Sequence, residues 1–241
     1  MDGRNTDFIP RGENKSKGGN SMKRKTKLLV ISLLAVMACV GVFKFPLKAA
    51  GNTPPTPGKD NFGISTVDLS SKKVSFVVGI SSGNYKAELE LYKGNKKVNT
   101  LTFGRTSDKV AVAKNAAYKY RVRLFHNDSS NNKVYSGWSP YRGFILPDIS
   151  GDSKSKGIKL KFRKASGVTK YVIYLSKKSG SSGFKKVKTQ KAKSKKSYTC
   201  QIKKNYAKKK TNYVRITPYL KINGYSGSSD VIFSGSVYVN K

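Results

Sequence analysis

Two glutamates, Glu88 and Glu90, have a spacing that acid–base chemistry uses. Residues two positions apart in a strand point to the same side and lie about 7 Å apart, within the range of paired carboxylates in glycoside hydrolases. Leu89 and Leu91 alternate with them, and a half-buried strand turns its apolar residues to the core. We therefore expect both carboxylates to face solvent beside Lys86, as a solvated strand face and not a catalytic pair.

The chain has one histidine, His126, and two cysteines, Cys39 and Cys200. A zinc site needs three or four ligands, and no second His or Cys lies near His126 in the sequence. Cys200 alternates with Tyr198 and Ile202, which predicts a buried thiol, and we find no base to activate it. The sequence predicts no catalytic residue, no metal site and no cofactor, so we expect a protein that is not an enzyme.

Positive charge is the strongest feature of the composition. The 241 residues include 49 Lys and Arg, 40 of them Lys, against 12 Asp and Glu. Residues 149–241 hold 24 of these cations and two acids, whereas residues 62–148 hold 14 cations and six acids. Such an excess indicates a polyanionic partner, or simply a soluble surface, and both interpretations stay open.

The N-terminal 50 residues have the pattern of an export signal. A basic block at residues 23–27 precedes an uncharged run at residues 28–43, and Ala49 and Ala50 supply small residues for cleavage. The run is shorter than the roughly 20 residues of a membrane span. We expect a signal peptide at residues 22–50, with a lipidated Cys39 or an uncleaved anchor as alternatives.

The segments on either side of this signal have no fold pattern. Residues 1–21 are polar, and Met22 is a second possible start, so we interpret 1–21 as an untranslated leader or a disordered extension. Residues 51–61 contain the run Pro54-Pro55-Thr56-Pro57, which predicts a stiff, extended linker.

The rest of the chain alternates apolar and polar residues with a period of two. This pattern is typical of antiparallel sheets with one wet face, and turn signals separate the runs. The alternating runs are residues 74–80, 85–92, 118–124, 158–163, 171–175, 198–202 and 213–219. We expect an all-β protein.

An internal repeat divides the strands into two copies. The sequence Y-S-G-W-S at residues 135–139 returns as Y-S-G-S-S at residues 225–229, each after a long alternating run. We therefore expect two tandem antiparallel sandwiches, at residues 62–147 and 148–241, with the second strongly basic.

Each copy resembles a fibronectin type III domain, and the second resembles those of secreted or surface proteins of Gram-positive bacteria. Tyr118 and the alternation after it match strand F, and residues 136–139 match the lead-in to strand G. In the second copy, residues 167–174, 184–187 and 213–216 match strands C, C′ and F. The resemblance implies two Ig-like β-sandwiches over about residues 60–241.

Three positions depart from the pattern of that family. Phe76 and Phe162 stand where strand B carries a tryptophan. Asn212 stands where strand F of the second copy would carry its corner tyrosine, so we expect that hydrogen-bonded corner to be missing. Residues 148–156 have few apolar side chains, which predicts a poorly formed strand A.

Two surface patches are candidate binding sites in the second copy. The polyanion-binding patch comprises Lys159, Lys161, Arg163, Lys185, Lys186, Lys188, Lys195 and Lys196. An aromatic and basic patch comprises Tyr174, Tyr213 and Arg215 on the neighbouring strands C and F. Trp138 is a further candidate, either as a platform for sugar rings or packed locally.

These observations lead to a functional expectation. We expect a monomeric, exported, non-enzymatic protein of the bacterial cell surface or envelope that binds an anionic cell-wall polymer or an acidic glycan. Export disfavours nucleic acid as the partner, and a membrane would be contacted only through an uncleaved leader. A passive spacer and an accessory carbohydrate-binding module are the alternatives.

Overall fold

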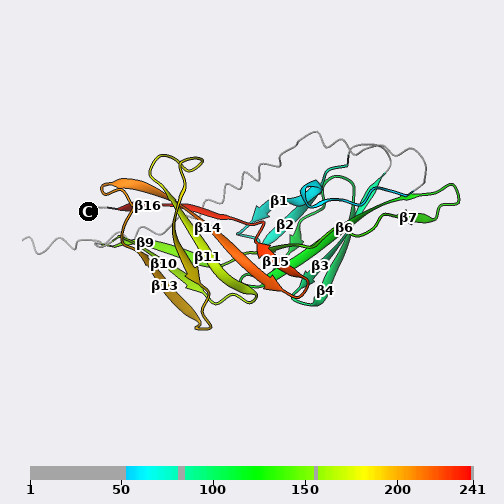
Figure 1. Ribbon diagram of the computed structural model, residues 1–241. Helices are drawn as coiled ribbons and strands as arrows, with labels where there is room; N and C mark the ends of the chain where they lie inside the picture. Colours follow the sequence, from blue (N-terminus) through cyan, green and yellow to red (C-terminus); the bar gives the residue numbers. More distant parts are fainter. Residues whose placement is uncertain (1–52, 81–84, 155–156, 240–241) are drawn as a thin grey trace, which may run out of the picture.

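The computed structural model describes residues 53–80, 85–154 and 157–239. The expected leader, Cys39 and the cleavage positions Ala49 and Ala50 lie outside these residues. The described chain is built of antiparallel strands, and its only helical segment is the 3₁₀ turn η1 (Lys59–Asn61) (Figure 1). None of its helices has the length and hydropathy to cross a membrane.

The first eight strands form one sandwich of two antiparallel sheets. The smaller sheet has the order β1-β2-β5, and the larger has the order β4-β3-β6-β7 with β8 also on β6. The bounds are β1 (Phe62–Asp68), β2 (Lys73–Val78), β3 (Lys86–Lys93), β4 (Lys96–Phe103), β5 (Val110–Ala111), β6 (Ala117–Asn127), β7 (Lys133–Tyr135) and β8 (Arg142–Ile145).

The remaining eight strands repeat this arrangement. The smaller sheet has the order β13-β10-β9, and the larger has the order β12-β11-β14-β15 with β16 also on β14. The bounds are β9 (Ile149–Lys154), β10 (Gly157–Arg163), β11 (Val168–Ser176), β12 (Lys185–Lys191), β13 (Ser197–Ile202), β14 (Lys210–Ile222), β15 (Tyr225–Ser228) and β16 (Phe233–Val239). The protein is therefore all-β, with two tandem fibronectin-type-III-like sandwiches, as predicted.

An aromatic cluster fills the core of each sandwich. Phe76 packs against Tyr120 at a ring-centroid distance of 4.9 Å, and Phe162 packs against Tyr171 at 4.7 Å. Both phenylalanines are fully buried, so each fills the place of the expected tryptophan. Cys200 is buried as predicted, and burial raises the pKa of its thiol, which disfavours the reactive thiolate.

In both sandwiches, a side chain near the start of strand F (β6 in the first, β14 in the second) forms a hydrogen bond to the backbone before it. In the first, the hydroxyl of Tyr118 accepts a 2.8 Å hydrogen bond from the N–H of Ala113, five residues upstream. In the second, Asn212 is fully buried; its Oδ1 accepts from the N–H of Ala207, also five residues upstream, and its Nδ2 donates to the carbonyl of Ala207. The prediction of a missing corner was wrong, because an asparagine amide satisfies the same backbone that a tyrosine hydroxyl would.

Strand A of the second sandwich is also better formed than predicted. β9 pairs with β10 in unbroken register from Ile149 opposite Phe162 to Lys154 opposite Gly157. Only Ile149 contributes a buried apolar side chain from this strand. Its pairing therefore rests on backbone hydrogen bonds to β10, which an apolar-residue count does not detect.

The two sandwiches are joined by packing as well as by the chain. Only residues 146–148 separate β8 from β9, and Leu146 among them is fully buried. A small cluster of Ala117, Ile145 and Leu220 spans the junction. The contact therefore combines a small area of apolar burial with a very short connection.

The repeated serine motif contributes to this junction in an unexpected way. In the first sandwich, Ser139 donates its N–H to the carbonyl of Val122 and accepts the N–H of Val122 on its Oγ. Its counterpart Ser229 donates to the carbonyl of Pro218, and proline has no N–H to return. The Oγ of Ser229 instead accepts the N–H of Val231 in its own sandwich at 3.1 Å and the N–H of Ile145 from the first sandwich at 3.3 Å. At the proline-containing copy, the serine hydroxyl thus also bonds across the junction.

Candidate functional site

The sequence predicted that the two glutamates of β3 face solvent, and this prediction was wrong. Glu90 is 8% exposed, and the Nη2 of Arg121 lies 2.7 Å from its Oε2. The Nη2 of Arg123 lies 2.6 Å from Oε1 of Glu88. The arginines lie on β6 directly opposite the glutamates in the register, so the pairs form a ladder across two strands. The expected solvated strand face is therefore a covered row of ion pairs.

Hydrogen bonds decide the charge state of Glu90. Burial by itself raises its pKa, but bonds from Tyr92, Arg121 and Lys97 outweigh burial and lower the pKa from 4.5 to about 2. Burial and the bond to Glu90 raise the pKa of Tyr92 to about 12. Glu90 therefore stays ionised at neutral pH and carries no proton to donate. We interpret Glu88 and Glu90 as partners in structural ion pairs and not as an acid–base couple.

Trp138 covers the arginines of this ladder. Its ring lies 4.4 Å from the guanidinium carbon of Arg121 and 4.5 Å from that of Arg123, and Tyr135 stacks on Arg123 at 3.6 Å. Trp138 is therefore packed locally, the second of the two possibilities that the sequence left open. The sequence contained a signal for the ladder, because Arg121 and Arg123 have the same spacing as Glu88 and Glu90. Recognising it requires knowing that β3 and β6 are paired.

His126 shows no sign of a metal site. Its ring packs edge-on against Tyr85 at 5.7 Å, and its Nδ1 has no hydrogen-bond partner. No group of three His, Cys, Asp or Glu side chains that could hold a metal ion occurs among the residues that the structure describes.

The two sandwiches differ in how they neutralise charge. In the first, Lys97, Arg121 and Arg123 pair with its own glutamates. Within residues 157–239, Arg163 is the only cation with a carboxylate partner, Asp148. The one acid in that range, Asp230, pairs with Arg142 of the first sandwich. No lysine of residues 157–239 therefore forms an ion pair with a carboxylate of the described chain.

The structure does not bring the eight predicted polyanion-binding residues into one patch. Lys159, Lys161 and Arg163 lie on the outer face of β10, where Arg163 pairs with Asp148 and Lys159 stands opposite Asp152 of β9. Acidic neighbours therefore weaken the positive potential of this part.

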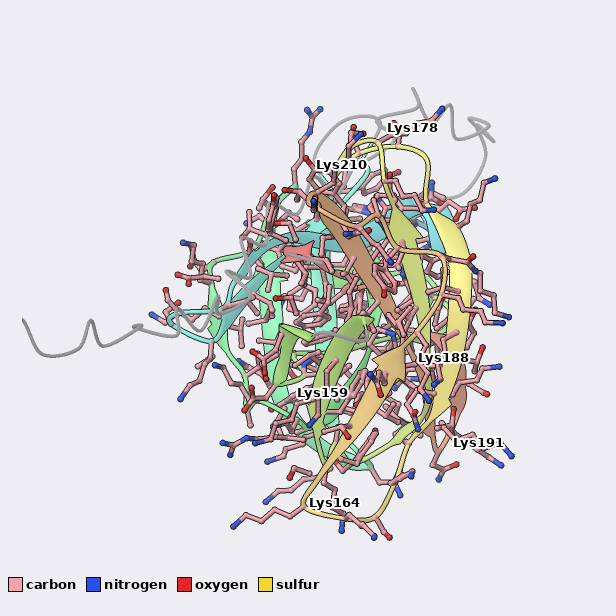
Figure 2. The ribbon with its side chains drawn as sticks, turned by 90° about the vertical axis from the view of Figure 1, so that its left-hand side faces the viewer. Lys159, Lys164, Lys178, Lys188, Lys191 and Lys210 are labelled. Carbon is pink, nitrogen blue, oxygen red and sulfur yellow. The ribbon has the colours of Figure 1, made fainter. Side chains whose placement is uncertain are left out.

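The other five predicted residues lie elsewhere. Lys185, Lys186 and Lys188 belong to β12, an edge strand that pairs with β11 alone among the described strands. Lys188 reaches across the sandwich, and its Nζ donates to the carbonyl of Gln201 on β13 at 3.0 Å. Lys195 and Lys196 lie in the connection from β12 to β13. Figure 2 shows the lysines spread around the second sandwich, with Lys159 and Lys164 apart from Lys188 and Lys191.

The predicted aromatic and basic patch is assembled in part. Tyr174 of β11 stands directly opposite Arg215 of β14, whereas Tyr213 stands opposite Ser176, two positions further along. The guanidinium of Arg215 lies 4.0 Å from the ring of Phe184. Lys186 of β12 is the partner of Tyr174 on its other side. The register therefore places a tyrosine between two cations, a combination that the sequence analysis had divided between two patches.

Comparisons with known proteins give little beyond the fold. No protein-family model matches the chain, and no curated protein matches it. Among solved structures, it is similar to the crystal structure of chicken CNTN1 FN1-FN3 domains, with 10% sequence identity and a TM-score of 0.26 over 78% of this chain and 67% of that chain. A likeness of this size carries no argument about activity or partners.

Proposed function

We propose that this chain is a non-enzymatic, exported protein of the cell surface or envelope whose second domain binds an anionic polymer through unpaired lysines. One observation carries the proposal. Among residues 157–239, no lysine lies within 4 Å of a carboxylate, whereas the first sandwich pairs cations with its own glutamates. Unbalanced charge of one sign on a small domain attracts a polyanion and releases its counterions.

The energetic cost of these lysines favours a role for them. Like charges on a compact domain repel one another, and neighbours within about 8 Å are poorly screened at physiological salt. The predominance of lysine over arginine suits a flexible polymer, because an ammonium acts as a point charge, whereas bidentate recognition favours arginine. Lysine used only for solubility, as in a passive spacer, is the competing interpretation.

The class of polymer follows from the expected export. An exported bacterial protein meets anionic wall polymers and acidic glycans, and nucleic acid less often. A carbohydrate-binding module built on Trp138 is disfavoured, since that ring is packed on Arg121 and Arg123.

A salt titration tests the binding proposal. The full chain is titrated with purified wall teichoic acid and with polygalacturonate, and the dissociation constants are measured between about 50 mM and about 200 mM salt. With about four lysine contacts, affinity falls about a hundredfold over this range, in proportion to a power of the salt concentration. A dissociation constant that does not change with salt concentration, or no binding to either polymer, contradicts the proposal.

Cell fractionation tests the export proposal separately. Native cells are divided into medium, salt wash, wall and membrane, and the N-terminus of the product is sequenced. We expect the protein in the salt wash or wall, with an N-terminus near residue 50. An intact chain among cytosolic proteins contradicts export.

A further inference from the structure

We infer that the polymer binds on the outer face of the β12-β11-β14 sheet, and that it is a linear acidic polysaccharide whose sugar rings carry the negative groups. This inference rests on the proposed function and adds the surface and the ligand chemistry. The surface is called the mixed face, and its residues are Lys170, Tyr174, Lys186, Lys191 and Arg215.

The strand register builds the mixed face in two rows. In one row, Lys186, Tyr174 and Arg215 stand side by side on β12, β11 and β14. In the other, Lys191 and Lys170 stand side by side on β12 and β11, with Tyr219 beside them on β14. Directly opposed residues of antiparallel strands point to the same side, so each row presents its side chains together.

The dimensions of the mixed face suit a chain of sugars. Three neighbouring strands are about 10 Å across, and the four steps along the strand from Lys170 to Tyr174 extend about 13 Å. Two pairs of cations therefore frame a surface with Val172 at its centre. Val172 points outward yet is only 5% exposed, so the longer side chains around it form a continuous cover.

Aromatic rings contact two of these cations. Arg215 stacks on Phe184, and the Nζ of Lys170 lies 4.6 Å from the ring of Tyr219. A cation resting on a ring loses less side-chain freedom when a ligand binds, so these contacts preorganise the face. Exposed lysines in loops, such as Lys195, have no such support.

The outer face of β10 is the weaker alternative. Arg163 there pairs with Asp148 at 2.9 Å, and Asp152 stands opposite Lys159. These carboxylates repel a polyanion. The mixed face holds no carboxylate in either row. The mixed face and the outer face of β10 both carry lysines, but only the β10 face has carboxylates that offset their positive charge.

Tyr174 favours a ligand with rings. It is half-buried between Lys186 and Arg215, and a tyrosine offers a flat apolar ring together with a hydroxyl. A sugar acid brings a negative group and an apolar ring face within one unit, which matches a cation beside a tyrosine. A bare polyphosphate chain has nothing to place on the ring.

Two variants with equal charge test the location. Lys170→Gln with Lys186→Gln removes one cation from each row of the mixed face, and Lys159→Gln with Lys161→Gln removes two from the β10 face. All four residues are on strands and at least partly exposed. We expect the first pair to weaken polygalacturonate binding at least about tenfold at about 50 mM salt and to lower the salt slope by about two, and the second to change affinity less than about threefold.

A third variant tests the ligand chemistry. Tyr174→Thr keeps a strand-forming residue and should weaken polygalacturonate binding about fivefold to tenfold, while binding of inorganic polyphosphate stays within about twofold. Circular dichroism and melting temperature verify that each variant is folded.

The outcomes separate this inference from the proposed function. If the unmodified chain binds neither polymer, the proposed function fails. If it binds with steep salt dependence but both lysine pairs weaken binding equally, the proposed function stands and the mixed face is overturned. If Tyr174→Thr weakens both polymers equally or neither, the assignment to an acidic polysaccharide is overturned.

Discussion

Arg142 and Asp230 lie 88 positions apart in the chain, and the guanidinium of Arg142 donates through both Nε and Nη2 to the Asp230 carboxylate, with a shortest distance of 2.6 Å. The Nη1 of Arg142 donates to the carbonyls of Lys59 and Phe62. Asp230 also accepts the hydroxyl of Tyr120 at 2.7 Å. A single ion pair thus ties the second sandwich to the start and the core of the first.

Removing the charge of Asp230 tests this connection. Asp230→Asn leaves Arg142 without its counter-ion, and we expect the free energy of unfolding to fall by about 2 kcal/mol. Chemical denaturation gives the stability, and small-angle X-ray scattering gives the spread of domain arrangements. Asp152→Asn makes the same change at an exposed residue of the same domain. Equal stability of the two variants would contradict the role of the pair.

Gly143 tests the packing of the same junction without touching a charge. A Cβ at this position would lie about 2.7 Å from Cδ1 of Tyr225, closer than such atoms approach. We expect Gly143→Ala to lower the unfolding free energy by about 1–3 kcal/mol, because the tyrosine must move. Gly104→Ala is the matched control, since a Cβ there meets no atom within 4 Å. If Gly143→Ala has the same melting temperature as Gly104→Ala, the junction is loosely packed and the expectation is contradicted.

Asn212 tests the substituted corner. Asn212→Ala leaves the partly buried N–H and C=O of Ala207 without their side-chain partner, and we expect a loss of about 1–3 kcal/mol in thermal or chemical denaturation. The control Asn132→Ala removes the same side chain from an exposed loop. Tyr118→Phe removes the corresponding bond of the first sandwich and should cost about 1 kcal/mol. A loss no larger than that of the loop control would mean that the amide does not support the corner.

The lowered pKa of Glu90 predicts how the stability of the first sandwich changes in acid. Its pKa is lower in the folded chain, about 2, than its ordinary value of 4.5, so the unfolded chain binds the extra proton in the interval between them. The stability that Glu90 contributes is therefore complete above about pH 4.5 and is lost as the pH falls through about 2. The shift corresponds to about 3 kcal/mol.

Denaturation curves across this interval provide the measurement. Glu90→Gln should be less stable than the unmodified chain at neutral pH, and its stability should vary less between about pH 5 and about pH 2. An unchanged acid response in Glu90→Gln would assign the effect to other carboxylates.

Much of the architecture could be predicted from the sequence. The alternation around Phe76, Phe162 and Cys200 correctly identified core positions because a strand period of two depends only on local order. The burial of Glu90 and the ion pairing of Glu88 could not be predicted in this way. Both depend on which strand lies beside β3, and the pairing with Arg121 and Arg123 becomes visible only once β6 is its neighbour.

The candidate site shows the same limit. Alternation placed Lys159 and Lys161 on outward positions, but it does not tell which sheet each strand joins. The eight predicted residues, seven lysines and Arg163, therefore fell on separate surfaces, and Lys170 and Lys191 were not recognised as lying on the same sheet face as Tyr174. Asn212 was misjudged for another reason: an amide can make the hydrogen bonds of a tyrosine hydroxyl, which a comparison by residue type does not detect.

The edge strand β12 has one more consequence. Among the described strands its backbone has a sheet partner on the β11 side alone, and an uncovered strand edge is a template for joining a second molecule. Lys185, Lys186, Lys188 and Lys191 make that edge strongly cationic, so two copies approaching edge to edge repel each other. The side chains that would attract a polyanion therefore also guard against self-assembly into extended sheets, and neutralising them would remove both effects at once.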